Sequence, residues 1–189
     1  MRRRDREVTD HQAIEAFLRR EQILRVAFYD QGDIYIVPVN YGFTCDGGGF
    51  TFYFHGAQAG RKYELSRKCP TVGFEIDGGY RPVAGNTACE FTAQFQSVIG
   101  TGVLRLLSDR QEKIAGLNAV MRQLSGKEDW DYSEAMVDRT AVYCLRAKNL
   151  SCKAKYQKEK TGGFRYVDDS GNSFRRVCGP YLHSGQGGH

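Results

Sequence analysis

The chain has 189 residues, of which 41% are hydrophobic and 12% aromatic, enough to bury the core of one globular domain. This composition excludes a disordered or fibrous protein. The formal net charge of +5 comes from the residues after Arg146, so the body of the chain is neutral and predicts no nucleic-acid-binding face. The longest apolar stretches have the length of strands, so we expect no membrane span.

Cysteine usage and the start of the chain bear on metal binding and location. The six cysteines include no C-x-x-C pair, and only four histidines accompany them, so we expect reduced thiols and no metal site. The arginine-rich start is followed by Glu7 and Asp10 in place of an apolar segment. We therefore expect no signal peptide and a cytoplasmic protein.

The first part of the chain alternates between helical and strand patterns. Apolar residues at helical spacing after Asp10 predict a short helix. Runs of β-branched and aromatic residues around short turns predict strands and a hairpin. The expected elements are the helix after Asp10, strands over residues 23–29, 34–43 and 50–55, and a helix over residues 61–68 that ends before Pro70.

The second part adds strands and one long amphipathic helix. We expect a strand over 71–77, an irregular Gly- and Pro-containing loop over 78–87, a long β segment over 88–107, a helix over 109–124 and a strand over 140–147. Many strands, few helices and no βα alternation predict a mainly β fold, an antiparallel β-barrel with accessory helices. Residues 1–156 are expected to form this domain. Residues 157–189 form a basic, glycine-containing extension, either a small hairpin or a disordered tail.

Two segments carry residues suited to binding a cofactor. Pro38 interrupts a well-formed strand, which predicts an edge or a bulge, and Asn40 lies on the same face with both donor and acceptor groups. Taken alone, these residues favour an ordinary edge strand over a binding role. The small residues after His55 allow close approach of a ligand, and Arg61 and Lys62 at the start of a helix suit a phosphate. A solvated basic first turn is the alternative.

Hydrolytic machinery is missing from the sequence. The chain contains no G-x-S-x-G elbow, Walker loop or H-E-x-x-H. His55 is the histidine placed within the expected core, and Ser97 offers a hydroxyl from another strand, yet both residue types are more often structural. If the protein is an enzyme, a cofactor is expected to carry the reaction.

Five segments stand in a fixed order along the chain: RRRDRE at 2–7, IVPVNYG at 36–42, YFHGA at 53–57 with GRK at 60–62, VGFEID at 72–77 and SVIGTG at 97–102. Together they resemble the pyridoxamine 5'-phosphate oxidase-related flavoproteins, and within these the 5-nitroimidazole-resistance (Nim-like) branch. The resemblance runs from residue 1 to about residue 155. It implies an FMN-binding split barrel that forms a homodimer with FMN between its subunits.

The resemblance also implies which residues hold FMN. Arg61, Lys62 and Ser97 would bind its phosphate, and the backbone from Pro38 to Tyr41 would line the isoalloxazine. His55 would be the catalytic candidate that orients or protonates the acceptor. The full set of expected cofactor-binding residues is Pro38, Val39, Asn40, Tyr41, His55, Gly56, Ala57, Arg61, Lys62, Ser97 and Val98.

The activity implied is that of an FMN-dependent reductase of the Nim-like type, with NADH or NADPH as electron donor and a small-molecule acceptor. A non-catalytic flavin-binding protein and a pyridoxamine 5'-phosphate oxidase are the alternatives. Residues 157–189 depart from the family pattern. They leave open whether the extension covers the flavin, binds a partner or, through its basic residues, contacts nucleic acid.

Overall fold

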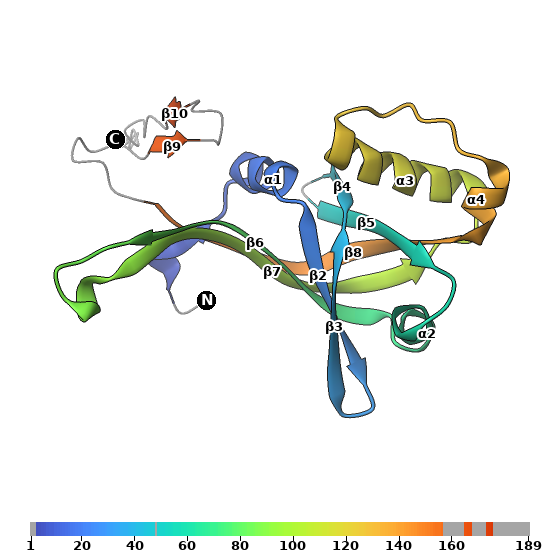
Figure 1. The fold of residues 1–189 in the computed structure, drawn as a ribbon, viewed down its shortest axis with the longest axis horizontal. Helices are drawn as coiled ribbons and strands as arrows, with labels where there is room; N and C mark the ends of the chain where they lie inside the picture. The colour runs from blue at the N-terminus through green and yellow to red at the C-terminus, as the bar shows by residue number, and fades with distance from the viewer. Residues whose placement is uncertain (1–2, 48, 157–164, 168–172, 176–189) are drawn as a thin grey trace, which may run out of the picture.

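The computed structural model describes residues 3–47, 49–156, 165–167 and 173–175 (Figure 1). Eight strands form one antiparallel sheet in the order β3-β2-β6-β7-β8-β5-β4, with β1 paired to β8. The strands are β1 (Glu7–Val8), β2 (Ile23–Asp30), β3 (Asp33–Asn40), β4 (Gly42–Asp46), β5 (Gly49–Ala57), β6 (Thr71–Val83), β7 (Thr92–Leu106), β8 (Thr140–Lys155), β9 (Arg165–Val167) and β10 (Ser173–Arg175). The helices are α1 (His11–Arg20), α2 (Arg61–Lys68), α3 (Arg110–Ser125) and α4 (Glu134–Arg139), with 3-10 turns η1 (Arg4–Arg6) and η2 (Ala88–Glu90).

The sheet curls around one apolar core, which confirms the mainly β barrel with accessory helices. Burial alternates along β2 and β5, so every second side chain points into the core. Phe28, Phe52, Phe54 and Leu145 are among the fully buried side chains. Helix α3 packs against β4 and β5, and α2 packs against β2 and β7.

The run expected to form one strand over residues 34–43 is two strands that meet at Tyr41. Strand β3 pairs with β2, whereas β4 pairs with β5 on the other side of the barrel. The Tyr41 side chain is fully buried, and its hydroxyl donates to the Leu18 carbonyl at 2.7 Å. This buried anchor fixes the point at which the chain changes partners.

Strands β6 and β7 extend past the barrel as an arm (Figure 1), so the irregular loop predicted over residues 78–87 is confined to residues 84–87. Strand β6 continues to Val83, with a register shift between Gly78 and Arg81. Gly79 has φ +62°, which accommodates the shift. Strand β2 pairs with β6 only over Gly73 to Glu75, so Pro82 lies on a free edge, where proline is tolerated.

Several other boundaries differ from the prediction. Strand β8 runs to Lys155 instead of ending at residue 147, because Cys152 and Ala154 continue the buried alternation. The strand expected from residue 88 begins at Thr92, and β1 and α4 were not predicted. Strands β9 and β10, in the extension, pair with each other. The rest of residues 157–189 lies outside the described residues.

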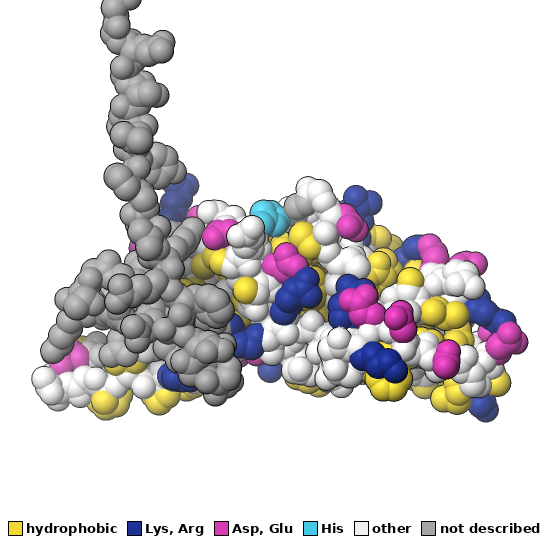
Figure 2. Space-filling model, turned by 90° about the horizontal axis from the view of Figure 1, so that it is seen from above, with side chains coloured by type: hydrophobic (Ala, Val, Ile, Leu, Met, Phe, Trp, Pro, Cys, Tyr) yellow, Lys and Arg dark blue, Asp and Glu magenta, His cyan; other side chains and the backbone are white. Residues whose placement is uncertain are grey.

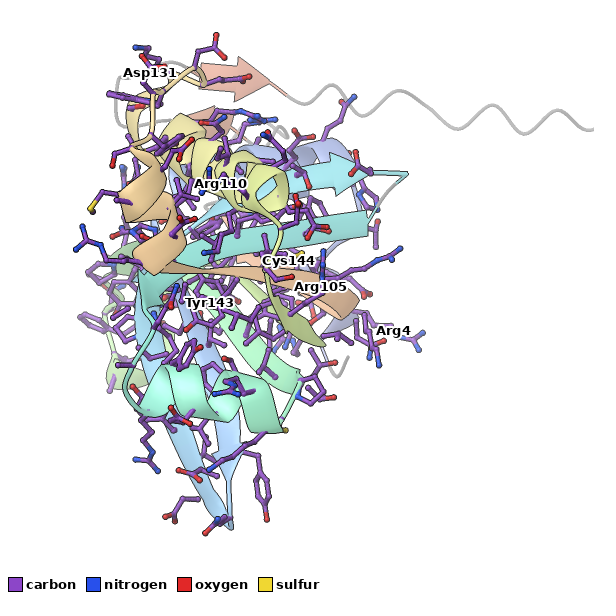
Figure 3. The ribbon with its side chains drawn as sticks, turned by 90° about the vertical axis from the view of Figure 1, so that its right-hand side faces the viewer. Arg4, Arg105, Arg110, Asp131, Tyr143 and Cys144 are labelled. Carbon is purple, nitrogen blue, oxygen red and sulfur yellow. The ribbon has the colours of Figure 1, made fainter. Side chains whose placement is uncertain are left out.

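Charged side chains of both signs are interspersed over the face seen in Figure 2. The ion pairs of the described residues include Arg105 with Glu112 at 2.9 Å and Arg110 with Asp138 at 3.0 Å. Arg105 and Arg110 are labelled in Figure 3. Within the described part of the chain, no helix combines the length and apolar character that a membrane crossing needs.

Gly42 follows Tyr41 directly and lies against the α3 backbone. A Cβ atom at this position would overlap the carbonyl group of Ala119 and the amide nitrogen of Val120. We expect Gly42→Ala to lower the free energy of unfolding by about 1–3 kcal/mol, because backbone cannot move aside as a side chain can. Gly49→Ala is the matched control, since its Cβ would meet only the Asp46 carbonyl oxygen at 3.5 Å. Equal urea midpoints for the two variants would contradict this prediction.

Candidate functional site

A surface cleft of about 370 Å³ lies where β3 and β5 diverge. Strand β4 follows β5 only as far as the pair Gly42 and Tyr53, and β3 is the last strand on its side of the sheet. Free backbone edges of β3 and of the end of β5 therefore flank the cleft. Its lining residues are Ile23, Pro38, Val39, Asn40, His55 and Lys62.

The β3 side of the cleft presents backbone and one amide side chain. Pro38 lies on an edge strand, as predicted, where its missing N–H leaves no sheet bond unmade. The Asn40 amide nitrogen donates to the Gln22 carbonyl at 3.3 Å, which fixes the orientation of the amide. Val39 directs its side chain inward against the core, so it contributes backbone to the cleft.

Lys62 reaches from the first turn of α2 across Gly56 to β5. Its Nζ donates to the His55 carbonyl at 3.2 Å. A Cβ at Gly56 would lie 2.6 Å from this Nζ, so glycine leaves room for the lysine. Burial lowers the pKa of Lys62 from its ordinary value.

His55 lies on β5 with its side chain exposed toward the cleft. Desolvation by the surrounding protein lowers the pKa of His55, and the charge of Lys62 lowers it further. The imidazole is therefore mainly neutral at pH 7, with one nitrogen as donor and the other as acceptor.

Arg61, the other expected phosphate ligand, points away from the residues that line the cleft. Its Nη2 and Nε lie 2.8 Å and 2.9 Å from the Asp30 carboxylate. Its guanidinium lies over the Tyr35 ring, 4.7 Å from the centroid. The ion pair with Asp30 explains how a cation is tolerated at a helix N-terminus.

The start of α2 offers backbone donors beside Lys62. The first helical bond runs from the Glu64 amide to the Gly60 carbonyl, so the three preceding amides have no carbonyl within the helix. Gly60 caps the helix with φ +90° and no side-chain cap. This end of the helix is therefore suited to an anion.

Five other predicted residues are not among those that line the cleft. Tyr41 is enclosed in the core, and Val98 is also fully buried. Ser97 lies on β7, opposite Asp77 on β6 and Lys153 on β8. Gly56 and Ala57 lie on β5, at the end of the strand that carries His55.

Sequence reasoning missed other residues around the site. Ile23 lines the cleft, and Asp30 binds Arg61. Tyr143, on β8 (Figure 3), lies close to Lys62, whose Nζ is 5.3 Å from its ring centroid. No local pattern pointed to Tyr143, because only the pairing of β5 with β8 brings it near. Among the described residues, no group of three or more His, Cys, Asp or Glu side chains could hold a metal ion.

These features define an antiparallel split barrel with a donor-lined cleft beside a helix N-terminus. The chain belongs to the pyridoxamine 5'-phosphate oxidase family, whose model matches residues 10–154. This confirms the family resemblance found in the sequence motifs. No curated protein matches the chain at a significant level.

Solved structures of similar fold include several flavoproteins. A proposed 5-nitroimidazole antibiotic resistance protein from Bacteroides thetaiotaomicron VPI-5482 is 25% identical with a TM-score of 0.68, over 78% of this chain and 86% of that one. The flavocytochrome Anf3 from Azotobacter vinelandii is 22% identical with a TM-score of 0.69, over 85% and 75%. A FAD- and heme-binding protein from Mycobacterium smegmatis is 14% identical with a TM-score of 0.70, over 96% and 93%. The last two show likeness of fold alone.

The electrostatics of the cleft can be tested by histidine titration. We expect His55 to titrate below its ordinary value of 6.5. Lys62→Met should raise the pKa of His55 only part of the way back, because desolvation is the larger cause. The pKa of His55 is lower in the folded protein than in the unfolded chain, so the unfolded chain binds a proton to this histidine more readily. The free energy of unfolding therefore decreases as the pH falls below 6.5, toward the lowered pKa. Proton NMR of the imidazole in both proteins measures this, and an unchanged His55 pKa in Lys62→Met would contradict it.

Proposed function

We propose that this protein is an FMN-dependent reductase of the Nim-like type, which passes electrons from NADH or NADPH to a small acceptor. The observation that carries the proposal is the cleft between β3 and β5. Its polar side chains are Asn40, His55 and Lys62, and no carboxylate of the described residues lines it. Family membership and the flavoproteins among the structural neighbours support flavin binding.

The donor set of the cleft suits a flavin mononucleotide. Lys62 and the first amides of α2 would hold the phosphate, with Arg61 in a lesser role because Asp30 already binds it. The free backbone edge from Pro38 to Tyr41, with the Asn40 amide, would line the isoalloxazine. The bound flavin supplies the electron or hydride transfer.

The acceptor would bind beside His55. A neutral imidazole can donate a hydrogen bond through its N–H to an acceptor oxygen, which would orient the acceptor and stabilise the charge that the oxygen gains, with the proton supplied by solvent water. Because the cleft holds a cation and no carboxylate, it favours acceptors whose oxygens become negative on reduction. A nitro group on an imidazole has this property, and so does a quinone.

A homodimer accounts for two features that the single chain leaves unexplained. The outer face of β2, β3 and β7 exposes Tyr29, Ile34, Ile36 and Ile99, each more than half accessible. Ser97 lies on this same face. It pairs with Asp77 on β6, and the Asp77 carboxylate accepts a hydrogen bond from Arg25 on β2. Arg25 in turn pairs with Pro38 on β3. A second copy seated on this face would bring Ser97 and the backbone at Val98 toward the partner's cleft.

The proposal also includes FMN as the particular flavin and the cytoplasm as the location of the protein. Two structural neighbours bind FAD or are flavocytochromes, so the released cofactor must be identified as FMN, FAD or heme. The described cysteines are free thiols, which supports a cytoplasmic location. They are Cys45, Cys69, Cys89, Cys144 and Cys152.

Flavin binding is tested by absorption spectroscopy of the purified protein with and without added FMN. We expect a bound-flavin spectrum that bleaches with NADPH or NADH and recovers on adding a nitroimidazole. Stable colour without turnover would support the non-catalytic flavin-binding alternative, and oxidation of pyridoxamine 5'-phosphate would support the oxidase. A protein that binds no flavin would contradict both the reductase and these alternatives.

Lys62→Gln should weaken FMN binding by about tenfold or more, because a charge-assisted phosphate contact is lost. Lys68→Gln on the same helix is the matched control, since Lys68 is exposed in the last turn of α2. Arg61→Gln should have a smaller effect than Lys62→Gln. Fluorescence titration of FMN measures all three, and equal affinities for Lys62→Gln and Lys68→Gln would rule out this phosphate assignment.

The dimer is tested with two equally exposed apolar residues. Ile36 on the outer face of β3 is 59% accessible, and Met136 on α4 is 57% accessible. We expect Ile36→Asp to dissociate the dimer and to lower flavin affinity, because a buried unpaired charge is costly. Met136→Asp should do neither. Analytical ultracentrifugation gives the masses, and a wild-type protein that sediments as a monomer would overturn the proposal.

A further inference from the structure

Two stacked aromatic rings lie directly beneath the Lys62 ammonium. Phe54 on β5 and Tyr143 on β8 are cross-strand partners, and both side chains are fully buried. Their ring centroids are 4.8 Å apart, with an interplanar angle of 16°. The Lys62 Nζ lies 5.7 Å from the Phe54 centroid and 5.3 Å from the Tyr143 centroid, within the range of a cation–π contact.

Three features of its surroundings fix the position of the Lys62 ammonium. The rings lie under it, and the His55 carbonyl accepts its hydrogen bond at 3.2 Å. The absence of a side chain at Gly56 leaves the space that Nζ occupies. A lysine at the start of a surface helix normally samples many rotamers, so this convergence restricts a side chain that would otherwise be mobile.

We propose that the Phe54–Tyr143 stack is a positioning platform that holds the Lys62 ammonium at the edge of the cleft, ready for an anion. Phe54 and Tyr143 act through Lys62 and do not touch the ligand themselves. The identification of that anion as the flavin phosphate rests on the function proposed above, whereas the platform itself is a property of the chain without ligand.

Pre-organisation explains why this arrangement matters for binding. An anion that meets an already oriented ammonium does not have to immobilise the lysine, so less conformational entropy is lost on binding. Arg61 shows a parallel arrangement, with a carboxylate and the Tyr35 ring holding its guanidinium. The two neighbouring cations are thus held in separate places, and only Lys62 lines the cleft.

The ligand-free protein provides the first test. In protein labelled with ¹³C-lysine, the Lys62 ε-methylene protons should be shifted upfield by the ring currents of Phe54 and Tyr143. Tyr143→Leu should remove much of this shift, whereas Tyr143→Phe, which retains the ring, should preserve it. An Lys62 signal at the ordinary lysine position in the wild-type protein would overturn the platform, whatever the protein does with flavin.

The second test measures FMN affinity by fluorescence titration. Loss of one cation–π contact in Tyr143→Leu should weaken binding roughly fivefold, with Tyr143→Phe close to wild type. Gly56→Ala leaves the core intact and displaces only the end of Lys62, so it should weaken binding even if Tyr143→Leu fails to fold. Normal affinity in a folded Tyr143→Leu and in Gly56→Ala would overturn the binding role. Absence of FMN binding by the wild-type protein would overturn the proposed function while leaving the NMR result valid.

Discussion

The change of sheet partner at Tyr41 and Gly42 is the constraint on which the rest of the structure depends. Up to Asn40 the chain pairs with β2, and from Gly42 it pairs with β5. The buried Tyr41 hydroxyl binds the end of α1, and Gly42 allows α3 to approach its backbone. Because no strand bridges β3 and the end of β5, the barrel is split and the cleft opens at the split.

The cleft has an uncommon electrostatic character for a small surface pocket. Two cations begin α2, where the helix dipole disfavours them, and each is stabilised differently. Asp30 neutralises Arg61, whereas the described partners of Lys62 are a carbonyl and two aromatic rings, without a carboxylate. A cation left without a formal counter-charge beside free helix amides is an arrangement that an anionic ligand would complete. The same charge helps to keep His55 neutral, so Lys62 influences both the charge of the cleft and the protonation state of its histidine.

Because β6 and β7 extend beyond the barrel as an arm, the fold differs from a simple barrel. Beyond Glu75 the strand β6 has lost its partner β2, yet β7 continues to pair with β8 as far as Lys155. Gln96, buried at the base of the arm, accepts hydrogen bonds from Arg20 and from Tyr156. The arm is therefore tied to α1 and to the end of β8.

Local sequence patterns determined most of the elements and part of the site. Alternation of apolar residues located β2 and β5, and helical spacing after Asp10 located α1 with its capping residue. The order of short motifs identified the family and singled out Pro38, Asn40, His55 and Lys62, which meet in one cleft. These features depend on residues near each other in the chain, so the sequence alone was sufficient.

Tertiary structure decided what depends on distant residues. Proline and glycine indicated a loop at residues 78–87, but a partner strand and a bulge made it an arm. Tyr41 reads as a site residue within its motif, yet it is buried because α1 supplies its hydrogen-bond acceptor. Arg61 and Lys62 are adjacent and both positively charged, yet their side chains have different partners. Arg61 binds the Asp30 carboxylate, whereas Lys62 contacts the Phe54–Tyr143 stack. Such contacts join segments far apart in sequence, so no local pattern encodes them.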